Sequence, residues 1–458
     1  MTLLLPWDAT YDPWAWIVWG REVAHLNLHT ADGPSWKPLP VLFTAPFSLA
    51  GHAAPALWLI VARASGLLAF AAAYAAGRRL AGPIAGAVAG VALLLNLDFD
   101  RVVWLGSSEG MLVAALLAAV ERDAAGARRT AFALGVACAL LRPEAWPFLA
   151  LYGAWLVWRD RSSLPLVTGS AILVALLWLG PELWGSGQLW RSADRAQQPV
   201  AAAATFAPDP ALEVARRADA MLLGPVPAAA VIAVAFAVGG IARRRRAAPT
   251  SVTVPAVALL ALAWIGLVAV MTAHGFSGNS RYVMAPAALI CVLAGVGGAQ
   301  TARVLAALIR RARVAPTVTA SLAAALIAAG MVPFAVHQAR ELGARLAVLE
   351  YQAEMRVGLE RAVAALGGPR AVLTCGQPVT EDYSVPMLAW YLGVHSASVG
   401  LDAPPRGAVF RARPGPRSRL DPPLGKGWHK DLRGFSGPFR VYARCGRPIG
   451  YPRFTGRS

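Results

Sequence analysis

Charged residues are scarce in this chain of 458 residues. Asp, Glu, Lys and Arg make up only 15% of it, while 57% is hydrophobic, whereas a soluble domain carries about 25% charged residues. Apolar runs of membrane-spanning length recur along the sequence. The composition therefore excludes an ordinary soluble protein and predicts a polytopic membrane protein.

Cysteine and the common cofactor motifs are also sparse. There are four cysteines, and no Cys/His cluster has the spacing of a zinc site. Cys138 and Cys291 lie in apolar runs, where cysteine packs as a small hydrophobic residue. Cys375 and Cys445 lie in the polar C-terminal part and can pair if that part faces an oxidising compartment. The absence of a glycine-rich nucleotide fingerprint argues against an enzyme that uses a nucleotide-sugar in the cytoplasm.

The net charge of +18 indicates nucleic-acid binding at first sight, but the arginines do not form one basic domain. They lie in short clusters between apolar runs, at 78–79, 128–129, 159–161, 243–246 and 310–313. Arginines in short loops mark the cytoplasmic side of a membrane protein. The clusters therefore exclude nucleic acid as a partner and orient the chain.

We predict ten apolar segments, at roughly 56–77, 82–97, 107–120, 130–141, 146–158, 164–181, 222–242, 252–273, 282–302 and 316–335. The third, fourth and fifth are shorter than the roughly 20 residues of a full span. Short or re-entrant helices persist at membrane depth only where they are buried in protein or line a cavity. The fold class is therefore mainly α, a polytopic transmembrane helical bundle of about ten visible spans.

With the arginine clusters inside, both ends of the chain lie outside the cytoplasm. Residues 1–55 then form a first external loop, 56–336 the membrane domain, and 337–458 a small extracytoplasmic C-terminal α/β domain. No span precedes the first loop, so we expect a first transmembrane helix upstream of the assigned start.

Local patterns predict the structure within these outer parts. Residues 12–26 have apolar residues at helical spacing and tryptophans, which predicts a helix lying flat on the outer leaflet. Residues 34–47 are rich in proline and are predicted to form a shaped loop. In the tail, 337–368 is predicted to be helical, followed by strands at 370–375 and 439–445.

Two aspartates open the chain in the stretch PWDATYDPWAWIVWGREV. Asp8 and Asp12 stand among Trp7, Trp14 and Trp16, and such neighbours desolvate a carboxylate and raise its pKa. A carboxylate at the mouth of a lipid-facing cavity can act as a general base. The alternative is that both are solvated loop residues.

This layout resembles the GT-C superfamily of integral membrane glycosyltransferases, which take a sugar from a polyprenyl-phosphate donor, including bacterial mannosyl- and arabinosyltransferases. The resemblance covers nearly the whole chain in topology and is loose in motifs. It implies that an aspartate of the first external loop is the catalytic base, which falls on Asp12 or Asp8. We favour Asp12, because it opens the predicted helix at an N-cap-like position. The missing first span departs from the family's layout.

Arginines of the outer loops are candidates to bind the donor phosphate, because the guanidinium plane matches phosphate oxygens. Arg281 in HGFSGNSRY is the first choice, with Arg142 in LLRPEAW as the second. Arg191 and Arg195 are four residues apart and share a helix face. The alternatives are a structural Arg142–Glu144 pair and a solvated helix around Arg191.

The remaining polar candidates, for the acceptor or the sugar, are Glu109, Glu144, Glu22, Lys37, His274 and Tyr282. Glu109 stands at the outer end of a short apolar segment, where it binds acceptor hydroxyls, assists a metal or simply marks the boundary of the span. His25, His29 and Asp32 do not match any strong metal-site spacing. We therefore expect no metal and no cofactor, with a divalent cation as the alternative.

The sequence thus predicts a plasma-membrane enzyme of the cell envelope. An acceptor hydroxyl, deprotonated by the aspartate, attacks the anomeric carbon with inversion while arginines stabilise the departing lipid phosphate. The sugar, whether mannose, arabinofuranose or another, and the acceptor, whether glycan, lipid or protein, stay open. A polyprenyl-lipid transporter or flippase is the rival interpretation, although no paired inverted halves are visible. A non-catalytic membrane scaffold is the third.

Overall fold

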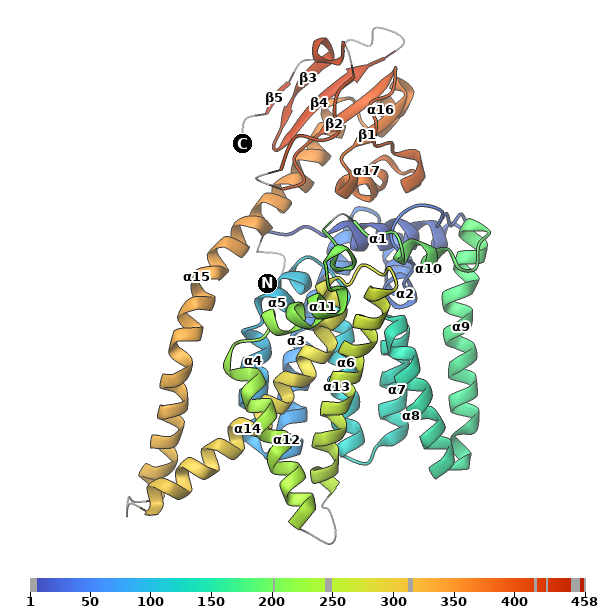
Figure 1. Cartoon of the computed structure of the whole chain (residues 1–458). Helices are drawn as coiled ribbons and strands as arrows, with labels where there is room; N and C mark the ends of the chain where they lie inside the picture. Colours follow the sequence, from blue (N-terminus) through green and yellow to red (C-terminus); the bar gives the residue numbers. More distant parts are fainter. Residues whose placement is uncertain are drawn as a thin grey trace.

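The computed structural model describes residues 6–200, 202–243, 249–311, 316–415, 418–425, 427–445 and 454–456. A bundle of helices carries a small α/β domain on one of its ends, and the long helix α15 joins the two parts (Figure 1). The predicted mainly α class with a C-terminal α/β domain is confirmed.

The ten predicted apolar segments all fall on helices. The bundle contains α3 (Ala54–Ala81), α4 (Pro83–Leu94), α5 (Leu97–Trp104), α6 (Glu109–Ala124), α7 (Arg128–Ala139), α8 (Trp146–Arg159), α9 (Leu164–Ser186), α12 (Pro225–Arg243), α13 (Pro249–Ala273), α14 (Met284–Arg311) and α15 (Pro316–Ala365). Proline at the first turn begins several of these helices, where its missing N–H has no intrahelical partner to lose.

Fewer of these helices are long enough to cross a membrane than the ten apolar segments indicate. By length and composition, five spans are found in the described part, or six if α4 and α5, bent by 65°, form one broken span. α6, α7 and α8 have 16, 12 and 14 residues, which confirms that the third to fifth segments are short helices. Their outer ends meet the site described below.

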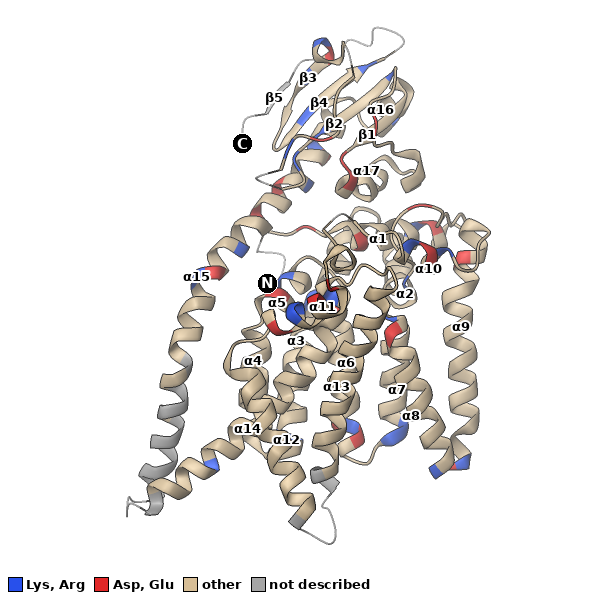
Figure 2. Ribbon diagram, viewed as in Figure 1, with Lys and Arg blue, Asp and Glu red and all other residues tan. Residues whose placement is uncertain are grey.

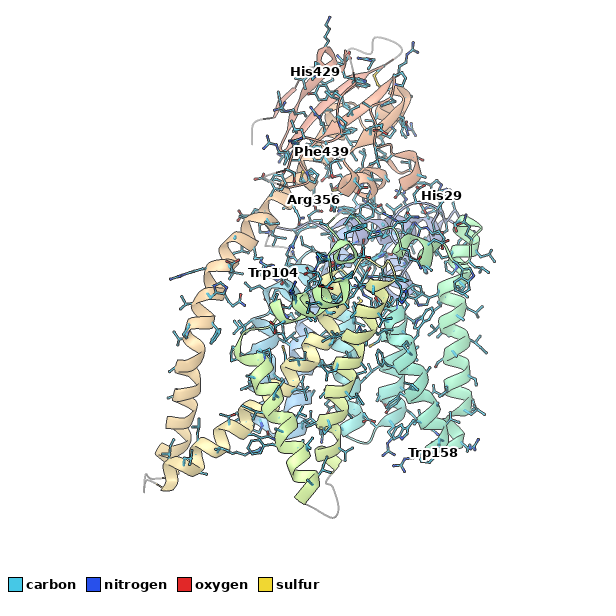
Figure 3. All side chains as sticks on the ribbon, in the orientation of Figure 1. His29, Trp104, Trp158, Arg356, His429 and Phe439 are labelled. Atoms are coloured by element: carbon cyan, nitrogen blue, oxygen red, sulfur yellow. A yellow bond between two sulfur atoms is a disulfide. The ribbon has the colours of Figure 1, made fainter. Side chains whose placement is uncertain are left out.

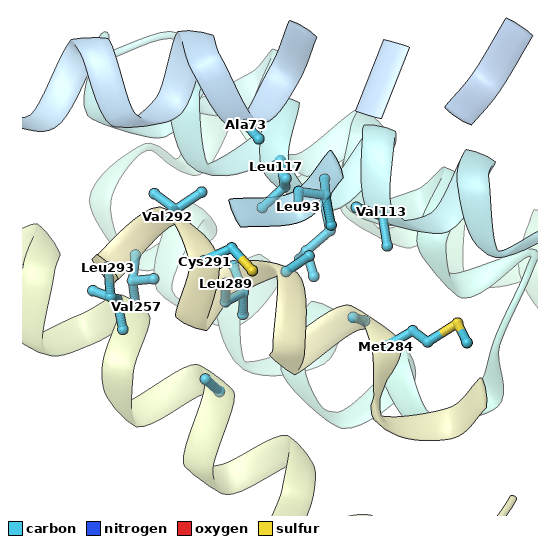
Figure 4. Close-up of a cluster of buried hydrophobic side chains, with 14 of the residues drawn as sticks. Ala73, Leu93, Val113, Leu117, Val257, Met284, Leu289, Cys291, Val292 and Leu293 are labelled. Atoms are coloured by element: carbon cyan, nitrogen blue, oxygen red, sulfur yellow. The ribbon is translucent and has the colours of Figure 1, made fainter. Parts of the chain in front are cut away.

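Small residues allow the central helices to pack closely. A Cβ on Gly77 would lie 2.6 Å from the carbonyl oxygen of Ala85, and one on Gly295 would collide with the same oxygen. Figure 4 shows the apolar core that results, in which Leu93, Leu117 and Leu289 meet. Close backbone approach of this kind is the usual way in which membrane helices associate.

Two short helices cover the end of the bundle that carries the α/β domain. α1 (Tyr11–Ala24) lies across this end, beneath the domain (Figure 1). Its helical state was predicted, but its environment was not. Trp14, Trp16 and Trp19 are at most 1% exposed and pack inside the protein, so the expectation of a helix lying on the lipid surface is wrong. Periodicity identifies an apolar face without revealing what covers it.

α2 (Pro38–Phe47) replaces the loop that we predicted for this stretch. Pro38 and Pro40 occupy its first turn, where proline is tolerated, so the prolines begin the helix instead of preventing it. The preceding residue, Lys37, is extended (φ −139°, ψ 115°). Side chains alternate along extended backbone, so Trp36 and Lys37 project to opposite sides.

The α/β domain is built on a five-stranded sheet in the order β1-β2-β4-β3-β5. The strands are β1 (Gln377–Thr380), β2 (Gly407–Arg411), β3 (Leu432–Ser436), β4 (Phe439–Arg444) and β5 (Phe454–Gly456). β1 and β2 are parallel, as are β3 and β5, and β4 is antiparallel to both of its neighbours. The final strand predicted at 439–445 corresponds to β4 and is confirmed.

The strand predicted at 370–375 is wrong, because this run forms the helix α16 (Pro369–Cys375). Pro369 sits at its first position, and the buried residues Val372 and Cys375 are three apart, which is a helical spacing. Cys375 forms a disulfide with Cys445, as the sequence allowed. α15 continues without a break across residue 336, where we had placed a domain boundary.

Candidate functional site

Asp12 and Arg281 form an ion pair where α1 meets the start of α14. Arg281 Nη2 donates to Asp12 Oδ2 over 3.0 Å. Asp12 lies in the first turn of α1, where the helix dipole favours a carboxylate. The N-cap position itself is held by Thr10, two residues earlier than the sequence indicated. Asn279 fixes the other partner, because its side-chain oxygen accepts from the backbone N–H of Arg281 at 3.0 Å.

A second ion pair, between Glu109 and Arg142, lies beside the first. Arg142 Nη2 donates to Glu109 Oε1, and the guanidinium stacks 4.6 Å from the ring centroid of Tyr282. Glu109 is fully buried, and Arg142 is 5% exposed. Residues from α6, from the turn before α8 and from the start of α14 therefore converge at one place.

Lys37 completes the cluster from the segment before α2. Its Nζ donates to Ser108 Oγ at 3.3 Å and lies 5.0 Å from the Trp16 ring centroid. Its charge acts on those of Arg142, Glu109, Asp12 and Arg281. We call the five residues Asp12, Lys37, Glu109, Arg142 and Arg281 the central charge cluster.

Burial and neighbouring charges set the protonation states of the two members that lie outside the spans. Burial raises the pKa of Asp12, but the Arg281 and Lys37 cations outweigh it and hold that pKa below its ordinary value. Burial, reinforced by Arg142, lowers the pKa of Lys37 to about 7. Asp12 is therefore ionised near neutral pH, and Lys37 is close to the point of gaining or losing its proton.

Three polar atoms in and beside the central charge cluster have no hydrogen-bond partner among the described residues: Glu109 Oε2, Arg142 Nε and Glu144 Oε2. Leaving a buried polar atom unpaired costs about 1–3 kcal/mol. Such atoms are rare and gather where a protein receives a ligand. Glu144 is 5% exposed and acts on the charge of Arg142, so this predicted residue lies at the edge of the cluster.

Most charged side chains of the bundle lie at its two ends, and the middle is almost free of them (Figure 2). The central charge cluster is at the end that faces the α/β domain. Arg129, Arg159 and Arg161 are at the opposite end, where Trp158 is 72% exposed (Figure 3). Arginines 244–246 and 313 of the predicted clusters lie outside the described residues.

Arg191 and Arg195 brace the first loop instead of joining the central charge cluster. Arg191 donates to the carbonyl oxygens of Pro34 and Gly33 at 2.6 and 2.9 Å, and Arg195 donates to Gly33 at 3.2 Å. Arg191 also lies 3.5 Å from Glu182. Both arginines stand on or beside α10 (Arg191–Ala196), which they tie to residues 33–34.

Asp8 is a buried structural carboxyl in this arrangement. Its Oδ1 accepts from Trp14 Nε1 at 3.0 Å and from the Ala9 backbone N–H at 2.7 Å. Burial raises the pKa of Asp8 to about 7. The nearest cation that acts on it is Arg356 of α15, which also stacks 3.8 Å from the Trp7 ring.

Two further predicted residues lie away from the cluster. Glu22, near the far end of α1, accepts from the backbone N–H of His29 at 3.0 Å and pairs with His395 of the α/β domain at 2.8 Å. His274 is exposed at the end of α13. In the described part of the chain, no group of three or more His, Cys, Asp or Glu side chains is arranged to hold a metal ion.

Sequence reasoning missed Arg63, which lies in the middle of the apolar run of α3. It is 5% exposed and donates to the carbonyl oxygen of Trp104 at 3.1 and 3.2 Å. This contact holds the end of α5 against α3. An ionisable residue within a membrane helix is a signal in its own right, and it would have identified Arg63.

No protein-family model matches the sequence, and no curated protein matches it significantly. Two crystal structures of ArnT from Cupriavidus metallidurans are similar in fold. The form bound to undecaprenyl phosphate has a TM-score of 0.59 and 13% identity, over 96% of this chain and 95% of that chain. The apo form has a TM-score of 0.53 and 15% identity, over 85% and 81%. The chain therefore has the fold of these two structures, and the expected resemblance is confirmed at the level of architecture.

Proposed function

We propose that this protein is a membrane glycosyltransferase that transfers a sugar from a polyprenyl-phosphate donor to an acceptor on the extracytoplasmic side. The observation that carries the proposal is the half-buried Asp12–Arg281 pair, with Lys37, Glu109 and Arg142 around it. A base and several phosphate-binding cations are what this transfer needs, and here they meet within a GT-C fold.

Arg281 and Lys37 bind the donor phosphate in this mechanism. Both act on Asp12 in the absence of substrate. When the donor phosphate pairs with Arg281 and Lys37, these cations stabilise the Asp12 carboxylate less, and Asp12 can accept a proton more readily. The phosphate anion also favours the charged form of Lys37. Because the pKa of Lys37 is about 7, a nearby anion is enough to keep it protonated near neutral pH. Arg142, held by Glu109 and stacked on Tyr282, supports the same phosphate.

The reaction is a displacement at the anomeric carbon of the donor sugar. Asp12 takes the proton of the acceptor hydroxyl, the hydroxyl oxygen bonds to the anomeric carbon, and the bond to the phosphate oxygen breaks. The sugar is transferred with inversion, and the lipid phosphate departs with the bonding electrons. Cations fixed in a buried site stabilise the charge that develops on the leaving group.

An apolar cleft of about 190 Å³ lies beside this position, between α2 and α9. Trp36, Val41, Leu177, Pro181 and Trp184 are among its walls. Trp36 directly precedes Lys37 and projects to the other side of the chain. The cleft offers an apolar binding surface on the first loop and α9 that suits an isoprenoid chain. ArnT, similar in fold, has been crystallised with undecaprenyl phosphate.

The orientation follows from the charges at the two ends of the bundle. Arg129 at the start of α7, Arg159 at the end of α8 and Arg161 just before α9 belong to helix ends that lie opposite to the site (Figure 2), and arginine-rich loops are cytoplasmic. The central charge cluster then faces the outside of the plasma membrane. Mannosyl and arabinosyl transfer both remain compatible with the site, and so do glycan, lipid and protein acceptors.

The substitution Asp12→Asn tests the proposal. It preserves the side-chain volume and removes the base, so sugar transfer should fall by about 10²-fold or more, while binding of polyprenyl phosphate is retained. Asp160→Asn, in an exposed pair with Arg129 at the other end of the bundle, is the matched control and should retain transfer.

The rival function, a polyprenyl-lipid flippase, would use the same cations. Under that alternative, the Asp12→Asn variant keeps lipid translocation in proteoliposomes, and the wild-type protein transfers no sugar. A non-catalytic scaffold would be indifferent to the change. Unchanged sugar transfer by Asp12→Asn would refute the role assigned to Asp12.

A further inference from the structure

A polar pocket of about 430 Å³ lies at the opposite end of α1 from Asp12, at the contact with the α/β domain. Its walls are formed by Arg21, Glu22, His25, Asn27, Gly393, Val394, His395 and Ser398. The first four belong to α1 and the residues just after it, and the others follow α17 (Val385–Leu392). In Figure 3, His29 lies at the end of the α1–α/β domain contact that holds the pocket, and Arg356 lies at its other end.

The charged residues of the pocket hold its walls together. Arg21 donates to the carbonyl oxygens of Trp390 and Val394 at 3.3 and 2.6 Å, at the C-terminal end of α17, where a cation is favoured. Glu22 is 3% exposed and binds His395 Nδ1 at 2.8 Å. These contacts lock the loop at 393–395 against α1, so the pocket has a fixed shape.

The exposed groups of the pocket are neutral hydrogen-bonding groups. Asn27 Nδ2 lies 3.3 Å from His395 Nε2, which leaves the Asn27 amide oxygen as an acceptor. His25 Nδ1 lies 2.8 Å from the carbonyl oxygen of Arg21, which leaves Nε2 of the ring for a ligand. Ser398 adds a hydroxyl at the rim.

This chemistry selects a ligand rich in hydroxyl groups over an anion. A phosphate would meet the carboxylate of Glu22 in the wall, and the Arg21 guanidinium already donates to backbone carbonyls. Neutral hydroxyl groups can donate to the free acceptors and accept from the Ser398 hydroxyl. Sugar units have this character.

α1 sets the separation between the pocket and the central charge cluster. Ten residues separate Asp12 from Glu22 along this helix, and an α-helix rises 1.5 Å per residue, so the two are about 15 Å apart. A molecule that occupies both places must span this distance, as an extended chain of sugars can.

We propose that this pocket binds a distal sugar unit of an acceptor glycan, about 15 Å from the hydroxyl that Asp12 deprotonates. The inference rests on the proposed function for the role of this glycan as acceptor. It assigns a neutral oligosaccharide as the acceptor class, and it makes the junction between α1 and the α/β domain a determinant of acceptor length.

Binding of defined saccharides to the detergent-solubilised full chain tests the inference. The probes are mannosides and arabinofuranosides of one to four units, each used both free and as the octyl glycoside. The added hydrogen bonds of the distal units should make the four-unit saccharide of one of the two series bind about tenfold or more tightly than the single unit of that series. Tighter binding of the octyl form would identify a lipid-linked glycan, and equal binding of both forms a lipid-free one.

A matched pair of variants tests whether the dependence of affinity on saccharide length arises in this pocket. Ser398 and Ala397 are both exposed on the same turn, but only Ser398 lines the pocket. Ser398→Trp should fill the pocket and remove the dependence of affinity on length, whereas Ala397→Trp should leave it intact. Affinity independent of length in the wild-type protein, or identical behaviour of the two variants, would overturn the inference.

The same measurements separate this inference from the proposed function. Asp12→Asn leaves the pocket untouched, so it should retain length-dependent binding while it loses sugar transfer. If the wild-type protein transferred no sugar, the proposed function would fail while the pocket result would stand, and retained transfer by Asp12→Asn would refute only the role of Asp12. A loss of length dependence in Ser398→Trp alone supports the pocket whatever the outcome of the transfer assay.

Discussion

Asp12 is half-buried and yet ionised, and this combination depends on single neighbouring residues. A carboxylate in a desolvated position prefers to be protonated, and a protonated Asp12 could not act as a base. Arg281, held in place by Asn279, reverses this preference. The same guanidinium is the main candidate to bind the donor phosphate, so one residue both prepares the base and binds the leaving group.

The pH dependence of transfer therefore reports on this pair. In Arg281→Gln the cation is lost and burial dominates, so the pKa of Asp12 rises. Because Asp12 must be deprotonated to act, the acidic limb of the kcat/KM profile should move to higher pH. Transfer rates between about pH 4 and 9 measure this shift.

The control for this prediction is Arg129→Gln, which breaks an exposed pair with Asp160 at the other end of the bundle and should leave the profile unchanged. An acidic limb that stays in place in Arg281→Gln would mean that Asp12 is not the titrating base.

At the scale of elements, the crossing of α1 and α2 positions the site. Thr44 of α2 donates from its hydroxyl to the Trp16 carbonyl oxygen at 2.7 Å, and Gly20 packs against the same threonine. A Cβ on Gly20 would lie 2.5 Å from the Thr44 carbonyl carbon. This close approach fixes α2 relative to α1, and with it Lys37 relative to Asp12.

Gly20→Ala should therefore destabilise the protein although alanine is the better helix former. We expect a loss of about 1–3 kcal/mol from overpacking, seen as a lower Tm, together with weaker donor binding as Lys37 shifts. Gly169→Ala, in α9 with nothing within 4 Å of the added Cβ, should be neutral or stabilise by up to about 1 kcal/mol. Equal Tm values for the two variants would contradict this account of the crossing.

At the scale of the whole molecule, the α/β domain covers the end of the bundle that holds the site. α15 carries the chain from the far end of the bundle to this domain (Figure 1). On its way, Arg345 pairs with Asp98 of α5 at 2.6 Å, and Arg356 contacts Trp7. The first loop, the bundle and the domain thus meet around α1.

The disulfide between Cys375 and Cys445 closes a loop of 70 residues within this domain. On the chain-entropy model, it stabilises the domain by about 4 kcal/mol. The double variant Cys375→Ser/Cys445→Ser should lower the Tm of the α/β domain and increase its proteolysis, with little change in the helical signal of the bundle. Cys291→Ser, at a free buried cysteine in α14, is the comparison. An unchanged proteolysis rate in the double variant would show that the domain is held by its contacts alone.

Much of the site was visible in the sequence as a set of residue types. Asp12, Arg281, Arg142, Glu109 and Lys37 were all predicted, since charges beside apolar segments have few structural uses. Their pairing was not predicted. The sequence offered a pair of Arg142 with the nearby Glu144 as an alternative, whereas the structure pairs Arg142 with Glu109, 33 residues away. Arg191, a lower-ranked candidate for the phosphate, donates to the backbone of the first loop.

By itself, the sequence determined that this is a membrane protein and that its apolar segments are helical, and it predicted that the polar outer loops hold the functional residues. These properties follow from hydrophobicity and from the spacing of residues that are close together in the chain. The tertiary structure alone decided which charges meet, that α1 is covered by protein instead of lipid, and that 370–375 is a helix. Each of these depends on contacts between residues far apart in the chain, and on burial that a local pattern does not encode.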